Sequence, residues 1–412
     1  MEQRYGAAGL ARVILHGRVP PAVEKVLERA VEDLAGLRGI RHVVLGVEPG
    51  DRSYRWIGAT GTANPSGAPM TPETPYCLAS VTKLYIGAAV LRLEEQGRLS
   101  IDDPLTDHLP DQLVSGLHRR RGVDRTADLT LRHLLGHASG LPEYLSEAAK
   151  GQKGLLDRVI EQGDLSWNTS DVIDMVRAAR GAHFGPRPFD GHRHTVRYSD
   201  TNFQLLMAVI EAVTRRPIHE AFARLIYEPL GLTRTWHPGT PPEASMPPAA
   251  VPWAGDEPMN RPLALRSFRD LFSTAEETLR FLRAVITGEL FDDPATAERM
   301  RQHWNPLGFS LIPSAPGWPI EYGLAMMRFQ APRLLKPLFP IPTLIGHTGA
   351  SGSWLFYAPD SDLYLTGTVD QLTAPAVPFK KLPRLVRQIP SYATWAQEKA
   401  ASIRPSEARR PA

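Results

Sequence analysis

Residues 80–97 have the sequence SVTKLYIGAAVLRLEEQG, and from Val81 to Leu93 apolar side chains occur on nearly every side of a helix. A helix that is apolar all round has to be buried at the centre of a protein. Gly97 offers a natural end, because glycine readily adopts the left-handed conformation that closes many helices. The pattern therefore predicts a central, buried helix that starts at Ser80.

Ser80 and Lys83 are three residues apart, so their side chains lie on one face of this helix, in adjacent turns. A serine hydroxyl is a weak nucleophile, and a lysine within hydrogen-bonding distance can serve as its base when burial lowers the lysine pKa. The free N–H groups of a helix start also favour developing negative charge. Such spacing arises by chance as well, and a simple helix cap at Ser80 is the competing interpretation.

Strand patterns occur near both ends of the chain and helix patterns between them. Two hairpins are predicted, with strands and turns at residues 42–47, 49–53 and 54–57 for the first, and 353–357, 359–362 and 363–369 for the second. Apolar spacings of three and four predict an opening helix at 21–37. Within 129–286, helix starts are predicted at Thr130, at Pro217, and at a capping box of Ser273 and Glu276.

This order of elements predicts an α/β protein of the α+β type, with one antiparallel sheet that is flanked by helices and built from both chain ends. We expect one domain over residues 1–412, with a sheet subdomain at approximately 1–79 and 310–412 and an inserted, mainly helical subdomain at approximately 80–309. The active cleft would lie between them. Proline-rich residues 238–262 and 332–342 are predicted to be long loops that frame this cleft.

The composition excludes several classes of protein. The 412 residues include 47 Lys and Arg against 44 Asp and Glu, a formal net charge of +3 that is too balanced to favour nucleic acid or an anionic membrane. No segment has the length of a membrane span or the pattern of a signal peptide. Cys77 is the only cysteine, which excludes an internal disulfide framework. We expect a cytoplasmic protein with no nucleic-acid or membrane partner, of undetermined oligomeric state.

Three short motifs resemble those of a known family. In chain order they are Ser80-Val-Thr-Lys83, Tyr198-Ser-Asp200 and His347-Thr-Gly349. They are similar to the S-x-x-K, Y-x-N and K-T-G motifs of the serine β-lactamases, penicillin-binding DD-peptidases and related esterases and transesterases, especially the class C branch. Residues 129–142 and 202–232 resemble the family too, and the similarity spans roughly residues 42–369.

The resemblance implies a role for each matching residue. Ser80 would be the nucleophile that forms an acyl-enzyme, and Lys83 the neutral base that takes its proton. Tyr198 would relay protons to the leaving group and later activate water. The oxyanion hole would consist of the backbone N–H groups of Ser80 and Ala350. No cofactor is implied.

Two positions depart from the family pattern. Asp200 replaces an amide that contacts the substrate in β-lactamases, and His347 replaces a lysine that helps to bind the substrate carboxylate. Together with Thr348 and Gly349, they are the predicted substrate-binding residues. A carboxylate at position 200 would repel a carboxylated antibiotic, and a neutral imidazole is a weaker anion anchor. We therefore expect weak or no β-lactamase activity.

Two histidine pairs were weighed as metal ligands. His133 and His137 have the i, i+4 spacing of a helical metal pair, and His192 and His194 form a second short cluster. Neither pair is accompanied by a third ligand that would complete a zinc motif, so no metal site is predicted. Cys77 has no evident base partner and is interpreted as a small buried side chain.

These observations predict a serine hydrolase that acts on a small-molecule ester or amide, of the esterase or D-peptidase type. A biosynthetic acyltransferase, which passes the acyl group to an alcohol or amine, is one alternative, because its chemistry is identical up to the acyl-enzyme. A non-catalytic, penicillin-binding-like sensor is another. Labelling by a reactive-serine probe separates the sensor from the two enzymes.

Overall fold

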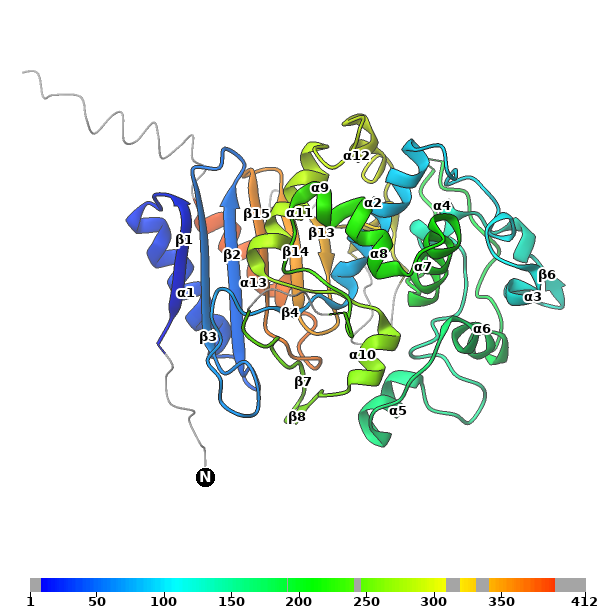
Figure 1. Ribbon diagram of the computed structural model, residues 1–412, viewed down its shortest axis with the longest axis horizontal. Coiled ribbons are helices and arrows are strands. Elements are labelled where there is room, and N and C mark those ends of the chain that lie inside the picture. The colour runs from blue at the N-terminus through cyan, green and yellow to red at the C-terminus, as the bar shows by residue number, and fades with distance from the viewer. Residues whose placement is uncertain (1–8, 191, 241–245, 309–318, 331–340, 390–412) are drawn as a thin grey trace, which may run out of the picture.

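A nine-stranded antiparallel sheet forms the centre of the molecule. The computed structural model describes residues 9–190, 192–240, 246–308, 319–330 and 341–389. Across the sheet the strand order is β1 (Ala11–Gly17), β3 (Tyr54–Gly61), β2 (His42–Pro49), β15 (Leu363–Thr368), β14 (Ser353–Ala358), β13 (Leu344–Thr348), β12 (Met327–Phe329), β11 (Ile320–Tyr322) and β10 (Asn305–Pro306). Figure 1 shows the N-terminal strands at one edge of this sheet.

The two ends of the chain meet in the middle of the sheet. β2 pairs with β15, with Val47 opposite Leu365, and both predicted hairpins are present as β2–β3 and β14–β15. Every residue of β2 and of β15 is buried, as expected for strands that are covered on both faces. The predicted fold class, an antiparallel sheet built from both chain ends and flanked by helices, is confirmed. The division into a sheet and a helical subdomain stays a prediction.

Helices pack on both faces of the sheet (Figure 1). α1 (Pro21–Ala35) and α13 (Val377–Gln388) contact each other and one face, and α11 (Ala275–Thr287) covers β2, β14 and β15 from the other. α1 buries the apolar stripe that was expected in residues 21–37, namely Val23, Leu27, Val31 and Leu34. The opening helix is therefore confirmed.

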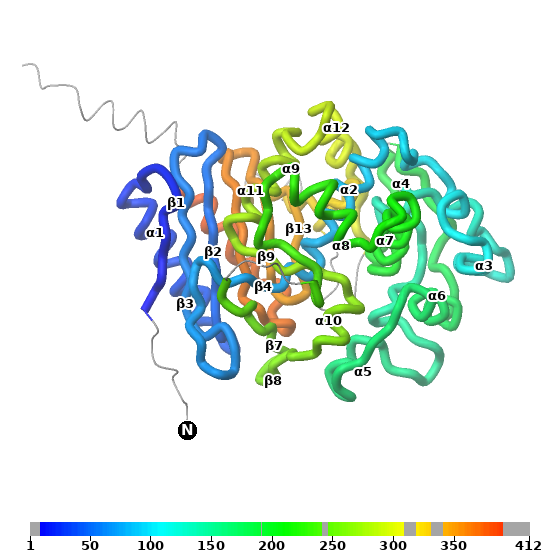
Figure 2. The backbone as a smooth tube through the Cα atoms, viewed as in Figure 1, coloured from blue at the N-terminus to red at the C-terminus, as the bar shows by residue number. Residues whose placement is uncertain are grey.

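The remaining helices lie beside the sheet (Figure 2). They are α2 (Thr82–Glu95), α3 (Asp111–Val114), α4 (Leu131–Leu135), α5 (Leu155–Gln162), α6 (Thr169–Ala178), α7 (Asp200–Thr214), α8 (Ile218–Phe222), α9 (Glu228–Leu230), α10 (Pro262–Phe268) and α12 (Ala295–Arg299), with one-turn helices η1 (Ala79–Val81), η2 (Leu105–Asp107), η3 (Thr126–Asp128) and η4 (Ala223–Tyr227). Short strand pairs join β4 (Tyr76–Cys77) to β9 (Phe272–Ser273), β5 (Arg119–Arg120) to β6 (Val123–Asp124), and β7 (Trp253–Ala254) to β8 (Glu257–Pro258). Among the described helices, none has the length and apolar character that crossing a bilayer requires.

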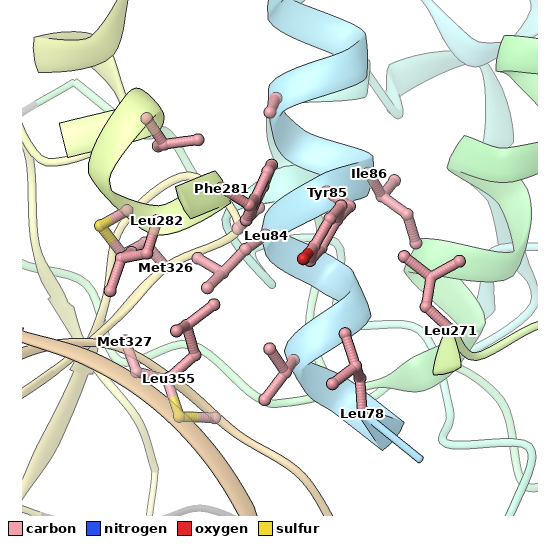
Figure 3. Close-up of a cluster of buried hydrophobic side chains, with 14 of the residues drawn as sticks. Leu78, Leu84, Tyr85, Ile86, Leu271, Phe281, Leu282, Met326, Met327 and Leu355 are labelled. Carbon is pink, nitrogen blue, oxygen red and sulfur yellow. The ribbon is translucent and has the colours of Figure 1, made fainter. Parts of the chain in front are cut away.

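α2 is buried on all sides, as its sequence predicts. Eleven of its 14 residues are buried, Lys83 among them. The ring of Tyr85 stacks on Phe281 of α11 with 3.5 Å between centroids, and Figure 3 shows Leu84 and Tyr85 within this apolar cluster. Gly87 allows the close approach of the chain at Ala325, because a Cβ at residue 87 would lie 2.4 Å from the Ala325 Cβ. The helix that carries Lys83 is therefore held rigidly between the sheet and the helical layer.

One of the three predicted helix starts is confirmed, and the other two lie one residue from their predicted positions. Thr130 caps α4, as expected. Pro217 is the residue before α8 rather than its first residue. The predicted capping box of Ser273 and Glu276 is wrong: Thr274 caps α11 and accepts a hydrogen bond from the Glu277 N–H, since Ser273 pairs with Tyr76 in a strand.

Only part of each proline-rich stretch lies within the described residues. The described residues of the first, including 246–262, form irregular backbone around β7 and β8 and the start of α10. Of the second, residues 332–340 lie outside the described residues, so the predicted loop there is not tested.

A buried ion pair attaches α11 to the sheet. Glu48 and Arg283 are 1% and 4% exposed, and the Arg283 Nε donates to the Glu48 carboxylate at 2.6 Å. The other two nitrogens of Arg283 donate to the carbonyls of Gly50 at 2.9 Å and Pro49 at 2.5 Å, and Arg55 donates to the second carboxylate oxygen of Glu48. Both charges are thus fully hydrogen-bonded, which burial requires.

The Arg283→Met variant should lower the free energy of unfolding by about 3 kcal/mol, because it leaves a buried carboxylate short of a partner. The measurement is urea unfolding followed by circular dichroism. Arg280→Met is the matched control on the same helix, since Arg280 is 41% exposed, pairs with Glu276 and donates hydrogen bonds to the carbonyls of Leu230 and Gly231. It should cost less than about 1 kcal/mol. Equal losses in the two variants would show that the buried pair does not anchor α11.

Candidate active site

Ser80 lies in a tight turn between β4 and α2. The backbone N–H of Leu78 donates to the carbonyl of Leu271 at 2.8 Å, next to the pairing of β4 with β9. Ala79 has a φ of 44°, a left-handed conformation that is unusual for a residue with a side chain. Such strain persists only where the surrounding structure enforces it, and it is frequent at active sites. The turn therefore holds Ser80 in a defined position.

Two side chains from different segments contact the Ser80 hydroxyl. Lys83 Nζ donates to Ser80 Oγ at 2.9 Å, and the Tyr198 hydroxyl is also 2.9 Å from it. The contact of Lys83 with Ser80 is predicted by helical spacing alone. Tyr198 belongs to the segment just before α7 and is 118 residues from Ser80 in the sequence. The first two predicted motifs thus meet at one oxygen atom.

Asp200 is the ionic partner of Lys83. Its Oδ1 forms an ion pair with Lys83 Nζ and lies 3.5 Å from the Tyr198 hydroxyl. The backbone N–H of Asp200 donates to the Glu143 carboxyl group. Burial and the negative charge of Asp200 raise the pKa of Glu143 well above its usual range. Asp200, predicted as a substrate contact, therefore belongs to the hydrogen-bond network around the nucleophile.

The charge state of Lys83 differs from the neutral base that was expected. Burial acts to lower the pKa of Lys83, but the carboxylates of Asp200 and Asp270 outweigh it and raise this pKa above its ordinary value. Burial and Asp200 also raise the pKa of Tyr198 well above its ordinary value. The resting site therefore contains an ammonium at Lys83 and a neutral phenol at Tyr198. A neutral Lys83 is not favoured, because its nearest neighbour is a carboxylate.

His133 and His137, the pair with the spacing of metal ligands, form hydrogen bonds and packing contacts with neighbouring residues. His133 accepts a hydrogen bond from the Thr130 N–H at 3.0 Å in the cap of α4. His137 Nδ1 accepts from the Ser199 N–H at 3.2 Å, and its ring packs on Tyr198 with 4.3 Å between centroids. Burial and then the charge of Lys83 lower the pKa of His137 well below its ordinary value. Among the described residues, no three His, Cys, Asp or Glu side chains are grouped as metal ligands.

His347 lies behind the site. It is fully buried, its Nδ1–H donates to the Thr348 carbonyl at 2.6 Å, and its Nε2 accepts from the Tyr322 hydroxyl at 3.0 Å. Burial and the charge of Lys83 lower the pKa of His347 to about 3, so the ring is neutral. The Thr348 hydroxyl donates to Met327 Sδ at 3.9 Å. The structure therefore keeps these two predicted substrate contacts off the cavity wall beside Ser80.

Gly349 and Ala350 bring the end of β13 to the nucleophile turn. A Cβ at Gly349 would lie 2.6 Å from the Leu78 carbonyl oxygen and 2.2 Å from Ser353 Oγ, so only glycine allows this approach. Ser353 Oγ donates to the same Leu78 carbonyl at 2.7 Å. Neither the Ser80 N–H nor the Ala350 N–H donates to an acceptor within the described ranges. Two free N–H groups on adjoining turns are what an oxyanion hole requires.

A largely apolar cavity lies beside Ser80. It encloses about 920 Å³, including the part open to solvent, and Lys83, Asp200 and Ala350 also line it. Its apolar wall consists of Ala79, Ile86, Leu145, Leu156, Val159, Phe203, Met207, Pro252, Met259, Ala264, Leu265, Phe268 and Leu372. Pro252 and Met259 belong to the proline-rich stretch that was expected to frame the cleft. The polar wall residues Tyr144, Arg261 and Asp270 carry no local motif, so sequence patterns alone do not reveal them.

Comparisons with known proteins show the family and its solved relatives. The family model described as Beta-lactamase matches residues 27–386. The chain belongs to the beta-lactamase family. Esterase EstB of Burkholderia gladioli is 27% identical over 293 residues, which cover 64% of this chain and 69% of the esterase. A D-stereospecific amidohydrolase from Streptomyces sp. has 25% identity and a TM-score of 0.60, covering 87% of this chain and 96% of the amidohydrolase.

A D-amino acid amidase from Ochrobactrum anthropi SV3 has the same fold, with a TM-score of 0.67 at 19% identity over 89% of this chain and 98% of the amidase. Membership of the beta-lactamase family, together with the esterase and amidohydrolase relatives, makes the chain a serine hydrolase or acyltransferase.

The Ser80→Ala variant should form no covalent adduct with a 4-nitrophenyl ester or a fluorophosphonate probe, whereas the wild type should gain one acyl group from the ester or one phosphonyl group from the probe, detected by intact-mass spectrometry. The melting temperature should stay within about 3 °C of wild type, since Ser80 caps no helix through its side chain and its loss costs at most about 1 kcal/mol. Ser351→Ala is the matched control, because Ser351 also lines the cavity but contacts neither Lys83 nor Tyr198 in the structure. An adduct mapped to another residue would contradict the assignment of Ser80.

Proposed function

We propose that this member of the beta-lactamase family hydrolyses an ester or amide with a large apolar group, through an acyl-enzyme on Ser80. One observation carries the proposal: Ser80 Oγ, with Lys83 Nζ and the Tyr198 hydroxyl each at 2.9 Å, lies on the wall of the apolar cavity. A nucleophile, two groups that hold exchangeable protons, and room for an acyl group therefore occur together.

The charges suggest the route of the proton. As Ser80 Oγ bonds to the substrate carbonyl carbon, its proton passes to the Tyr198 oxygen, and Tyr198 passes its own proton to the Asp200 carboxylate, 3.5 Å away. Lys83 remains an ammonium and stabilises the negative charge that develops on Oγ. In this scheme Asp200 is the final proton acceptor, and Lys83 acts through its charge.

The remaining steps use the same groups in reverse. The carbonyl electron pair moves onto oxygen, where the N–H groups of Ser80 and Ala350 would stabilise it. When the intermediate collapses, the bond to the leaving alcohol or amine breaks, and the proton returns through Tyr198 to that leaving group. Water then attacks the acyl carbon and gives one proton to Tyr198, the bond between that carbon and Ser80 Oγ breaks, and Tyr198 returns a proton to Oγ as the acid product leaves.

The cavity wall favours substrates without a carboxylate near the reacting carbonyl. Asp200 and Asp270 are carboxyl groups on the wall, and Lys83 is already paired with Asp200. His347, at the position that corresponds to the lysine of the K-T-G motif, is buried and neutral. A substrate carboxylate would meet repulsion from these carboxyl groups, and the wall cations Lys83 and Arg261 already have carboxylate partners. The esterase and amidohydrolase relatives support an ester or amide as the substrate.

Acyl transfer to an alcohol or amine remains the second candidate function, and the apolar cavity favours it. Most wall residues are apolar, and such a surface binds an apolar acceptor better than it binds water. Product analysis after addition of a long-chain alcohol distinguishes an ester from a free acid. The cytoplasmic location expected from the sequence stays a prediction.

The Asp200→Asn variant should lower kcat/KM for a neutral ester by about 10²–10⁴-fold near pH 7, because an amide cannot accept the relayed proton. It should also change the pH profile. Without Asp200 the pKa of Lys83 falls, so Lys83 loses its proton at lower pH than in the wild type, and activity of the variant should recover as pH rises.

The measurement is kcat/KM from pH 6 to 10, with the exposed Asp174→Asn as a control that leaves the profile unchanged. If neutral Lys83 were the base in the wild type, Asp200→Asn would raise the rate at pH 7, and that result would overturn the proposed route.

A chromogenic cephalosporin should be turned over at least about 100-fold less efficiently than a 4-nitrophenyl ester, since repulsion from Asp200 costs a few kcal/mol in a partly desolvated cleft. Asp200→Asn should lower the ratio of kcat/KM for the ester to kcat/KM for the cephalosporin, although it slows both reactions. His347→Lys should leave this ratio unchanged, because residue 347 does not line the cavity. Efficient cephalosporin turnover by the wild type would contradict the proposed substrate preference.

A further inference from the structure

Asp270 is a carboxyl group on the cavity wall that takes no part in the proton transfers proposed at Ser80. The next residue, Leu271, anchors it to the nucleophile turn: the Leu271 N–H donates to Thr82 Oγ1 at 2.9 Å, and the Leu271 carbonyl accepts from the Leu78 N–H at 2.8 Å. Residues 78 and 82 flank Ser80 on either side. The backbone therefore fixes Asp270 close to the site of acylation.

The other charged groups on the described cavity wall already have ionic partners. Lys83 is paired with Asp200, and Arg261 is paired with Glu257 at 3.1 Å. Asp270 forms no ion pair with any described residue, and its carboxyl group is hydrogen-bonded by the Thr82 side chain. The wall consequently has one carboxyl group, that of Asp270, for which no described cation is left as a partner.

The surroundings of Asp270 make a negative charge on it costly. Burial raises the pKa of Asp270 to about 7, although the charge of Lys83 acts in the opposite direction. The ionisable groups that interact with it from the neighbouring elements are Cys77, Lys83, Tyr144, Tyr198 and Asp200. Only Lys83 among them is cationic, and it is engaged by Asp200 and Ser80. A bound cation next to Asp270 would stabilise the carboxylate.

We propose that Asp270 binds an ammonium group of the substrate, so that the preferred substrates are amino-acyl esters or amides with an apolar side chain. The amine would lie close to the scissile carbonyl, because Asp270 is anchored beside the Ser80 turn. The apolar side chain would fill the wall formed by Phe203, Met207 and Leu265. This inference rests on the proposed function, because it assumes that Ser80 is acylated from this cavity.

The test compares two methyl esters that differ only in an amine, 3-amino-4-phenylbutanoate, as each enantiomer, and 4-phenylbutanoate. The wild type should have a kcat/KM at least about tenfold higher for one enantiomer of the amino ester. Asp270→Asn should reduce this ratio to near unity, and Asp270→Ser should do the same if the asparagine variant does not fold. The ratio cancels any effect of residue 270 on Lys83, because both esters use the same nucleophile.

Asp174→Asn is the matched control, since it removes one negative charge from a side chain that is 67% exposed and does not line the cavity, and its ratio should equal that of the wild type. An equal ratio in wild type and both Asp270 variants would overturn the ammonium site while leaving ester hydrolysis intact. If the wild type hydrolyses neither ester and no adduct forms on Ser80, the proposed function falls, and the ammonium site with it.

Discussion

A buried ammonium that must be paired governs the arrangement of this molecule. Lys83 is 4% exposed in a helix that is apolar on every side, where an unpaired charge would cost several kcal/mol. Asp200 supplies the opposite charge from the first residue of α7, so α2 and α7 have to pack side by side. That packing brings Tyr198, two residues before Asp200, to the Ser80 hydroxyl. One ion pair thus fixes the helices and the reacting groups together.

The same pair explains why the aromatic surroundings of Tyr198 are neutral. Its ring is near His137, Tyr322 and His347, at centroid distances of 4.3, 6.2 and 6.2 Å. Burial and the charge of Lys83 lower the pKa of both histidines, so neither adds a second positive charge to the site. Burial raises the pKa of Tyr322 well above its ordinary value. Lys83 therefore remains the single cation next to Ser80 within the described part of the chain.

Electrostatics and apolar packing have separate roles in the cavity. Side chains from α2, α5, α7 and α10 provide the apolar wall, which offers binding energy in proportion to the apolar surface that a substrate buries. The carboxyl groups of Asp200 and Asp270 lie near the nucleophile, where they act on the charge of the substrate over a short distance. Affinity would then come from the apolar wall, and discrimination among substrates from the two carboxyl groups.

The sequence by itself determined the features that depend on local spacing. The apolar pattern after Ser80 predicts the buried helix, the spacing of Ser80 and Lys83 predicts their contact, and alternating strands between turns predict both hairpins. Each is a property of a few neighbouring residues, so periodicity and turn chemistry suffice. The capping box predicted at Ser273 was wrong because Ser273 pairs with Tyr76 in a strand, and Tyr76 is distant in sequence.

Only the tertiary structure decided the charge of Lys83, the position of His347 behind the site, and the presence of Asp270 on the cavity wall. All three depend on atoms that are distant in sequence: Asp200 keeps Lys83 charged, Tyr322 holds His347 in the interior, and the turn at Leu78 anchors the segment of Asp270. A pKa or a cavity is set by the sum of desolvation and charge from every neighbouring segment, and no local pattern contains that sum.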